Sequence, residues 1–148
     1  MEIIYKIKTV NAQEILAHLK ECSDDFYPPL IERVNLEEYS RKLLEKSITF
    51  EAWNQNFLVG LLAAYFNQNT DRSVFITNVS VLKKFMGMGI ASELLGQCIK
   101  YAAGKKIREI DLEVNKESAY AINLYGKFDF VIEGVSERLV KMKLKLIN

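Results

Sequence analysis

The spacing of apolar and polar residues changes several times along the chain and predicts four segments in its first third. Apolar and polar residues that alternate predict a strand within residues 1–10. Apolar residues at helical spacing predict one helix after Asn11 and a second after Asn35, because Asn caps helices well. Between these helices, residues 23–30 contain the two prolines of the chain and predict a loop.

A period of two follows and predicts three consecutive strands. Residues 48–52 and 57–61 flank a turn at residues 54–56, which is the pattern of an antiparallel hairpin. Residues 74–81 alternate in the same way and predict the third strand. The middle of the chain is therefore expected to form a meander of neighbouring strands.

Helical spacing returns in the last third of the chain. It predicts helices over residues 90–103 and 117–127, with a strand between them at residues 107–114. Gly104 is placed to end the first of these helices. Two strands are expected to complete the chain, the last within residues 138–147, where lysines alternate with apolar residues.

The order of these elements predicts the fold class. Strand, two helices, three strands, helix, strand, helix and two strands give a mixed α/β fold of the α+β kind. Its central sheet is expected to be mostly antiparallel and flanked by about four helices, in a single domain over residues 1–148. A doubly wound fold would need strands and helices that alternate throughout.

Composition and charge remove several classes of function. The 148 residues are 49% apolar, which is enough for a core without disulfides or a metal. A net charge of +1 argues against nucleic acid as a partner, and no apolar run is long enough to span a membrane. With no signal peptide at its start, we expect a cytoplasmic protein. Cys22 and Cys98 lie far apart and outside any CxxC, and His18 is the single histidine, so zinc spacing, a redox pair and a Cys–His nucleophile lack support in the sequence.

The first candidate for chemistry is the glycine-bearing junction between the strand at 74–81 and the helix that begins near residue 90. The first N–H groups of a helix have no internal partners and lie at the positive end of its dipole, so they bind phosphate or pyrophosphate. Gly87 and Gly89 would let an anion approach this backbone. The same glycines would also suit a tight turn without a ligand, and by themselves they support both interpretations equally.

A second motif follows one helix and one strand later, and the two together carry a resemblance. The motifs read Met86-Gly-Met-Gly-Ile-Ala91 and Ser118-Ala-Tyr-Ala-Ile-Asn-Leu-Tyr-Gly-Lys-Phe-Asp-Phe130. They resemble the GNAT superfamily of acyl-coenzyme A-dependent N-acetyltransferases, whose pattern is Arg/Gln-x-x-Gly-x-Gly/Ala followed by Asn-x-x-Ala-x-x-Leu-Tyr-x-x-x-Gly-Phe. The order of elements agrees with that family over the whole chain.

Four positions depart from the family pattern. Met86 stands where Arg or Gln is usual, Lys83 where a proline often follows the strand, Ser118 where Asn is common, and Asp129 where Gly precedes the last Phe. Met86 removes a side-chain donor near the pyrophosphate, although backbone amides make the family's principal contacts. Asp129 predicts a different backbone at its turn, because Asp adopts the left-handed conformation less readily than Gly.

The resemblance implies a coenzyme A site and one catalytic side chain. By similarity, the backbones of Val79 and Val81 would bind the pantetheine arm, whereas their side chains also suit a core. The remaining residues implied for the cofactor site are Met86, Gly87, Met88, Gly89, Ile90, Ala91 and Ser118. Tyr125 would protonate the departing thiol as general acid, although helical spacing alone favours a core tyrosine.

The general base is not identified by the sequence. Glu51 and Glu113 are candidates on strands, where their alternation with apolar neighbours predicts that they face solvent. The side chains that could relay a proton are Tyr65, Asn78 and Ser80. His18 is expected to be half-buried or exposed on the first helix, without a function.

The loop between the first two helices is the candidate site for the acceptor. The resemblance implies that Phe26 and Tyr27 bind it, and Asp24 and Asp25 beside these rings could receive a cationic amine. A solvated acidic loop with two rings in the core is an equally supported alternative.

The resemblance implies transfer of an acetyl group from acetyl-CoA to a primary amine of a small molecule or protein terminus, by direct attack in a ternary complex. Acetyl-CoA would be the cosubstrate, no metal is implied, and a homodimer is left open. A non-catalytic GNAT-like module that binds coenzyme A or a partner is the alternative. The near-neutral charge argues weakly against polyamines or acidic acceptors as the dedicated substrate.

Overall fold

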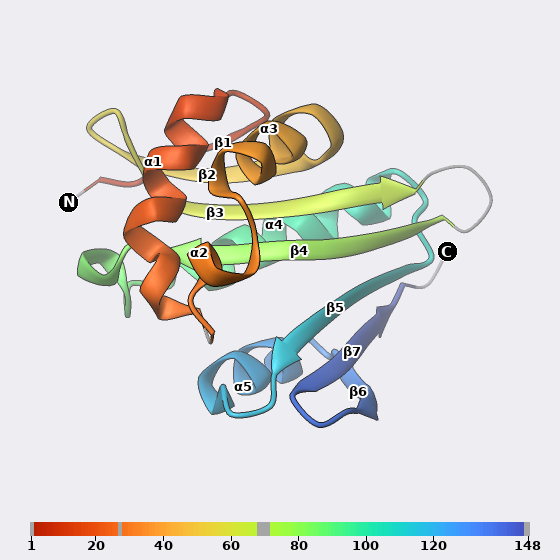
Figure 1. The fold of residues 1–148 in the computed structure, drawn as a ribbon. Helices are drawn as coiled ribbons and strands as arrows, with labels where there is room; N and C mark the ends of the chain where they lie inside the picture. Colours follow the sequence, from red (N-terminus) through yellow and green to blue (C-terminus); the bar gives the residue numbers. More distant parts are fainter. Residues whose placement is uncertain (1, 27, 68–71, 147–148) are drawn as a thin grey trace.

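The fold is a single twisted sheet with helices on both faces (Figure 1), seen in a computed structural model that describes residues 2–26, 28–67 and 72–146. The strands are β1 (Ile4–Ile7), β2 (Ile48–Asn54), β3 (Phe57–Asn67), β4 (Ser73–Val81), β5 (Glu109–Asn115), β6 (Val131–Val135) and β7 (Leu139–Lys145). The helices are α1 (Ala12–Cys22), α2 (Leu30–Arg33), α3 (Leu36–Lys46), α4 (Ile90–Gly104) and α5 (Ala119–Lys127), with short 3-10 helices at Ser23–Asp25 and Lys83–Phe85.

The sheet has the order β1-β2-β3-β4-β5-β7-β6. Every neighbouring pair is antiparallel except β4 and β5, which are parallel because α4 crosses over between them. The expected α/β fold with a mostly antiparallel sheet is thus confirmed. Five helices are found in the described residues, and the additional one, α2, begins where the predicted loop ends.

Capping side chains fix the starts of the two helices on the N-terminal side. The Asn11 side chain accepts a hydrogen bond from the Glu14 backbone N–H at 2.8 Å, and Glu14 returns one from its carboxylate to the Asn11 N–H at 2.9 Å. The Asn35 side chain accepts from the Glu38 N–H at 3.0 Å. Both helix starts predicted from the sequence are confirmed.

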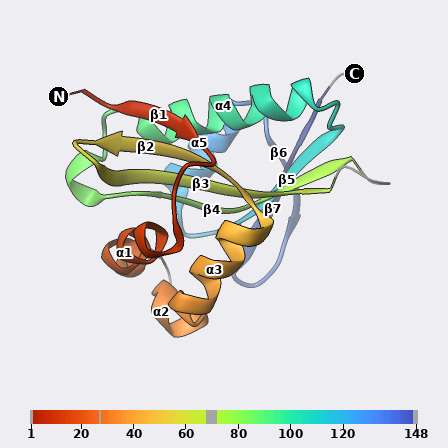
Figure 2. The same ribbon diagram turned by 90° about the horizontal axis from the view of Figure 1, so that it is seen from above.

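Helices lie on both faces of the sheet (Figure 2), and a hydrophobic cluster packs on each face. Strand β3 contributes to both, because its successive side chains point to opposite faces. Leu62 and Ala64 pack in the cluster under α4 and α5, whereas Leu61 and Ala63 pack in the cluster under α1 and α3. The central strands are therefore buried on both sides. A ligand site is expected where the sheet opens.

The sheet opens between β4 and β5. Their parallel pairing runs only from Ser73 to Ile76 on β4, although β4 continues to Val81. A bulge lies at the same point, because consecutive β3 residues pair with Ile76 and Asn78 and leave Thr77 as the extra residue. Figure 1 shows the two strands diverging beyond it. The second half of β4 thus has one edge without a partner strand.

The turn after α5 corrects one expectation. Asp129 has a φ of 72°, the left-handed conformation that Gly would adopt there. Its N–H donates to the Gly126 carbonyl at 3.0 Å, and the next N–H, of Phe130, donates to the Tyr125 carbonyl at 3.1 Å. The prediction of a different backbone at Asp129 was wrong, because Asp is among the residues that enter this region most readily after Gly.

None of the helices in the described ranges is long and apolar enough to cross a membrane.

Candidate functional site

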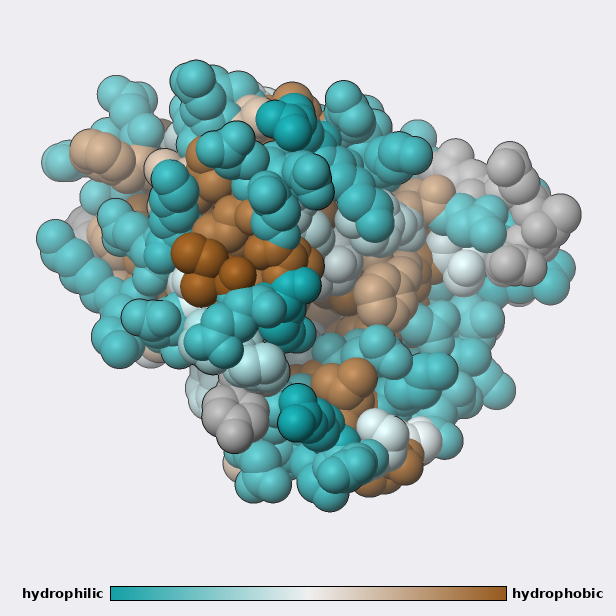
Figure 3. All heavy atoms as spheres, viewed as in Figure 1, coloured by the Kyte–Doolittle hydropathy of each residue, from teal (hydrophilic) through white to brown (hydrophobic). Residues whose placement is uncertain are grey.

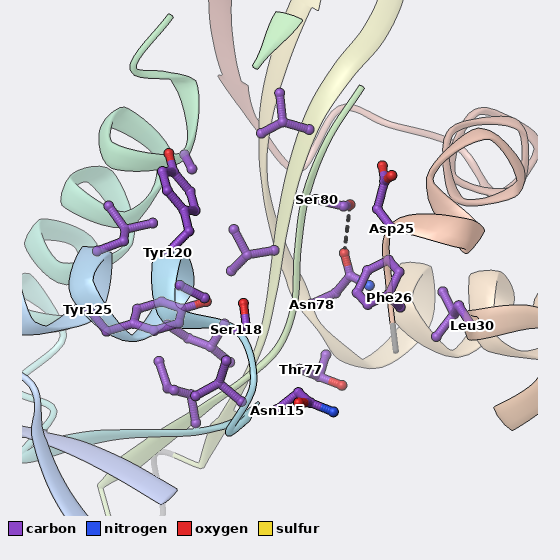
Figure 4. Close-up of a pocket in the computed structure, with 18 of the residues that line it drawn as sticks. Asp25, Phe26, Leu30, Thr77, Asn78, Ser80, Asn115, Ser118, Tyr120 and Tyr125 are labelled. Carbon is purple, nitrogen blue, oxygen red and sulfur yellow. Dashed lines mark hydrogen bonds between the residues drawn. The ribbon is translucent and has the colours of Figure 1, made fainter. Parts of the chain in front are cut away.

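A pocket of about 900 Å³ occupies the opening between β4 and β5. It is lined by the diverging ends of these strands, by the start of α4, by α5, and by residues from 25–26 and 30–39. The surface is hollowed on this side of the molecule (Figure 3), and the close-up shows polar groups from β4 and α5 inside the hollow (Figure 4). A volume near the upper end of the range for ligand pockets suits an elongated ligand.

The glycine turn, residues 86–89, forms one end of the pocket. Gly87 and Gly89 have φ values of 80° and 78°, a conformation that L side chains rarely adopt. A Cβ atom at either position would meet nothing within 4 Å. Backbone conformation and not crowding therefore requires glycine here, and the space beside both residues is open to a ligand.

The turn leads directly into the N-terminus of α4. Gly89 is the N-cap, and the first intrahelical bond runs from the Glu93 N–H to the Gly89 carbonyl at 3.0 Å. The amides of the first turn, which begins at Ile90, precede that bond and have no carbonyl four residues back to receive them. The Met86 N–H differs, because it donates to the Lys83 carbonyl at 3.2 Å. An anion at this end of the pocket would face the amides after Met86 and the helix dipole.

Tyr125 reaches the pocket from α5. Its side chain is buried, and its ring packs against Phe130 with 5.7 Å between the ring centroids. Burial raises the pKa of the Tyr125 hydroxyl to about 12. A phenol is protonated at neutral pH even with its ordinary pKa of about 10, and the shift takes the hydroxyl further in that direction. It is therefore available as a hydrogen-bond donor. Ser118 lies beside it (Figure 4), and its hydroxyl does not cap α5.

The structure brings most of the residues implied by the resemblance to this one pocket. Those that line it are Val79, Val81, Met86, Gly87, Gly89, Ile90, Ala91, Ser118, Tyr125 and Phe26. Met88 is not among the lining residues, and its side chain is 45% exposed. Tyr27 lies outside the described residues. Neither Tyr65 nor Glu51 lines the pocket, whereas Glu113 does and is exposed as predicted.

The side of the pocket opposite α5 has both acidic and basic side chains. The Asp25 carboxylate lies 3.9 Å from the Lys83 ammonium, and the Arg33 guanidinium lies 5.7 Å from the centroid of the Phe26 ring. Asp24 is exposed and does not line the pocket. The acidic character expected of this segment is thus partly offset by the two cations.

Glu51 has a structural role. Its carboxylate accepts from the Thr9 N–H at 3.0 Å, the Val10 N–H at 3.2 Å, and the side chains of Thr9, Thr49 and Trp53 at 2.5, 2.6 and 3.1 Å. The prediction that Glu51 faces solvent was wrong, because the first helices cover that face of β2 and leave the residue fully buried. These five bonds fasten the segment before α1 to β2.

His18 is also buried, contrary to expectation. It is 3% exposed, with Nδ1 at 3.1 Å from the Leu58 carbonyl and Nε2 at 2.9 Å from the Ser80 hydroxyl. The Ser80 hydroxyl donates to the Asn78 side-chain oxygen at 2.9 Å (Figure 4). A hydrogen-bonded chain therefore connects α1 to the pocket. The sequence indicates only part of this hydrogen-bonded chain. Asn78 and Ser80 share one face of a Val-rich strand, but nothing in the sequence places His18 beside them.

The pKa of His18 should make the protein less stable in acid. Burial lowers this pKa from 6.5 to about 4 and outweighs the two hydrogen bonds, which raise it. The unfolded chain takes up a proton below pH 6.5 and the native state only below about pH 4, so stability is lost as pH falls through that window. The loss from this residue should reach about 3 kcal/mol.

An NMR titration measures this directly, because His18 is the only imidazole in the untagged chain. The free energy of unfolding of His18→Gln should fall less between pH 6.5 and 4 than that of the wild type. Titration of the native imidazole near 6.5 would contradict the prediction.

Comparisons with known proteins agree with this arrangement. The sequence model of the family described as Acetyltransferase (GNAT) family matches residues 12–130. Among solved structures, PaiA N-acetyltransferase of Thermoplasma acidophilum in complex with coenzyme A has 15% identity and a TM-score of 0.78, covering 99% of this chain and 100% of its own. No match was found among curated protein sequences.

Two further structures share the fold along nearly the whole chain. A GNAT-family acetyltransferase of Streptococcus pneumoniae has 21% identity and a TM-score of 0.77, covering 98% of this chain and 100% of its own. The protein PH1933 of Pyrococcus horikoshii has 25% identity and a TM-score of 0.78, covering 99% and 100%. The similarity therefore spans all the elements that form the pocket.

Proposed function

Because the chain belongs to the GNAT acetyltransferase family, we propose that it is an N-acetyltransferase that transfers the acetyl group of acetyl-CoA to a primary amine by direct attack in a ternary complex. The amine belongs to a small molecule or a protein terminus. One observation carries the proposal. A single pocket contains a glycine turn at the start of α4, a strand edge unpaired among the described residues, and a buried phenol.

Two parts of the pocket fit two parts of coenzyme A. The unpaired edge of β4 at Val79 and Val81 offers N–H and C=O groups to the amides of the pantetheine arm, as an added strand would. The glycine turn and the first amides of α4 offer donors to the pyrophosphate. Backbone groups supply these contacts, so the Met side chain at position 86 does not prevent them. PaiA of Thermoplasma acidophilum, which has the same fold, was crystallised with coenzyme A.

Tyr125 supplies the acid of the reaction. When the amine nitrogen attacks the thioester carbon, the carbon–sulfur bond breaks and negative charge develops on sulfur. The phenol, which is protonated at neutral pH, donates its hydrogen bond or proton to that sulfur. The amine loses its own proton to solvent or to Glu113, the exposed carboxylate on the pocket wall.

Acetyl-CoA should raise the melting temperature of the protein, and free thiol should appear when an amine is added. At a concentration of a hundred times Kd, binding adds about 2.7 kcal/mol, which corresponds to roughly 5–10 °C for a chain of this size. Thiol release is followed with butylamine, an aliphatic diamine and a short peptide with a free amino terminus. Stabilisation without turnover would favour a coenzyme A-binding module instead, and the absence of both would contradict the proposal.

A further inference from the structure

One cationic side chain lines the pocket on the side where the acceptor is expected. Among the described residues that line the pocket, Arg33 alone is a lysine or an arginine. It is the last residue of α2, and its guanidinium carbon lies 5.7 Å from the centroid of the Phe26 ring. No carboxylate in the described ranges forms an ion pair with it. The guanidinium therefore has N–H donors left for a ligand.

The other cation on this side of the pocket already has a partner. The Lys83 ammonium lies 3.9 Å from the Asp25 carboxylate, and the Lys83 side chain is 84% exposed and does not line the pocket. Asp25 thus has a counter-ion at the surface, whereas Arg33 has none in the described part of the chain. A planar guanidinium binds a carboxylate through two parallel N–H···O bonds, so a carboxylate is a ligand that suits its geometry.

The charge of Arg33 acts on the wall of the pocket. Tyr39 lies on this wall, with its hydroxyl oxygen 3.1 Å from Oγ1 of Thr77, the extra residue of the β4 bulge. Burial raises the pKa of the Tyr39 hydroxyl, and the positive charge of Arg33 is a smaller influence that lowers it. The guanidinium is therefore close enough to the bulge, where β4 and β5 begin to diverge, to act on a ligand in the opening.

Acidic side chains line the pocket from the β5 side. Leu112 packs in the cluster under α4 and α5, so its neighbour Glu113 points to the opposite face of the sheet, which α1 and α3 cover. Glu113 lines the pocket and is exposed, and so is Glu117, just before α5. A ligand in the opening would thus have a guanidinium on the α2 side and carboxylates on the β5 side (Figure 1).

We propose that the acceptor is a small amino acid, whose carboxylate binds the Arg33 guanidinium while its primary amine attacks acetyl-CoA. The inference rests on the proposed acetyl transfer and adds the chemical class of the acceptor. Such a zwitterion is complementary to the pocket, because its ammonium would face the Glu113 side. Its methylene groups would contact Phe26, which lies across the pocket from Tyr125 (Figure 4).

The reaction is the one already proposed, with the carboxylate unchanged. The amine nitrogen loses its proton to Glu113 or solvent and bonds to the acetyl carbon. The carbon–sulfur bond breaks, and Tyr125 protonates the sulfur. The products are an N-acetyl amino acid and coenzyme A.

Thiol release by the wild-type protein tests the acceptor class with amines of equal chain length. The amino acids are β-alanine, 4-aminobutanoate and 6-aminohexanoate, and their matched amines without a carboxylate are propylamine, butylamine and hexylamine. An aliphatic diamine, 1,4-diaminobutane, replaces the carboxylate by a second cation. At low ionic strength, at least one amino acid should exceed its matched amine in kcat/KM by about ten- to a hundredfold, the effect of a charge-assisted hydrogen bond.

Variants of Arg33 test whether this residue causes the preference. Arg33→Met keeps an unbranched side chain beside Phe26 and should reduce the ratio of the two kcat/KM values to about one. Arg33→Glu reverses the charge and should make the diamine a better acceptor than 4-aminobutanoate. Arg41→Met is the matched control, because Arg41 is exposed on α3 and does not line the pocket. It should keep the wild-type ratio.

The outcomes separate this inference from the proposed function. Protein that acetylates every matched amine, or a peptide amidated at its carboxyl terminus, at least as well as every amino acid would overturn the inference alone. A preference that persists in Arg33→Met, or that Arg41→Met loses equally, would also overturn it. If Arg33→Met does not fold, an unchanged preference in Arg33→Glu would have the same meaning. Wild-type protein that releases no thiol with any acceptor would overturn the acetyl transfer and, with it, the acceptor class.

Discussion

Tyr125→Phe should lower turnover by about a hundred- to ten-thousandfold, the range typical of general acid catalysis. The substitution keeps the ring that packs against Phe130 and removes only the hydroxyl. The Kd of acetyl-CoA and the melting temperature should therefore change little. Thiol release under saturating acetyl-CoA and amine measures kcat, and calorimetry measures the Kd.

Tyr101→Phe is the matched control for this experiment. Tyr101 lies on α4 between Phe50 and Phe66, at 5.5 Å from each ring centroid, and does not line the pocket. It should keep wild-type turnover. If Tyr125→Phe were stable and fully active, Tyr125 would be a core residue, and water would have to protonate the leaving thiolate.

The sequence predicted the fold well because local periodicity determines most of it. The two capped helices and the central meander follow from spacing and from residue types at their ends. The glycine turn was also predictable, since two glycines between a strand and a helix favour a tight turn with or without a ligand. Its two positive φ values bear this out. The pocket itself was harder to predict from the sequence, because it depends on where the pairing of β4 and β5 stops.

Long-range polar contacts could not be predicted from the sequence. Glu51 and His18 were expected at least partly in solvent, yet both are buried. The α1–α3 layer covers the Glu51 side of β2, and His18 lies on the side of α1 that packs against β3 and β4. Their partners lie far away in the chain. The bond from Thr9 to Glu51 spans 42 residues, and the one from His18 to Ser80 spans 62. No spacing rule relates residues at such separations, although most buried polar groups have a hydrogen-bond partner.

Gly89→Val should weaken coenzyme A binding by about ten- to a hundredfold. A branched side chain is strained at a φ of 78°, by about 1–2 kcal/mol, so the turn would relax toward negative φ. The amides that follow would then point away from the pyrophosphate, and the loss of one charge-assisted hydrogen bond accounts for the weaker binding. Calorimetry with coenzyme A measures the affinity, and thermal unfolding measures the strain.

The variant Gly104→Val is the control that distinguishes an effect on the glycine turn from an effect on α4 as a whole. Gly104 ends the same helix, has no positive φ and leaves open space for a Cβ atom, as Gly89 does. This variant should bind coenzyme A like the wild type. An unchanged affinity in a folded Gly89→Val protein would refute the glycine turn as the pyrophosphate site. Equal losses in both variants would mean that α4 transmits a general destabilisation, because only the backbone at position 89 faces the pocket.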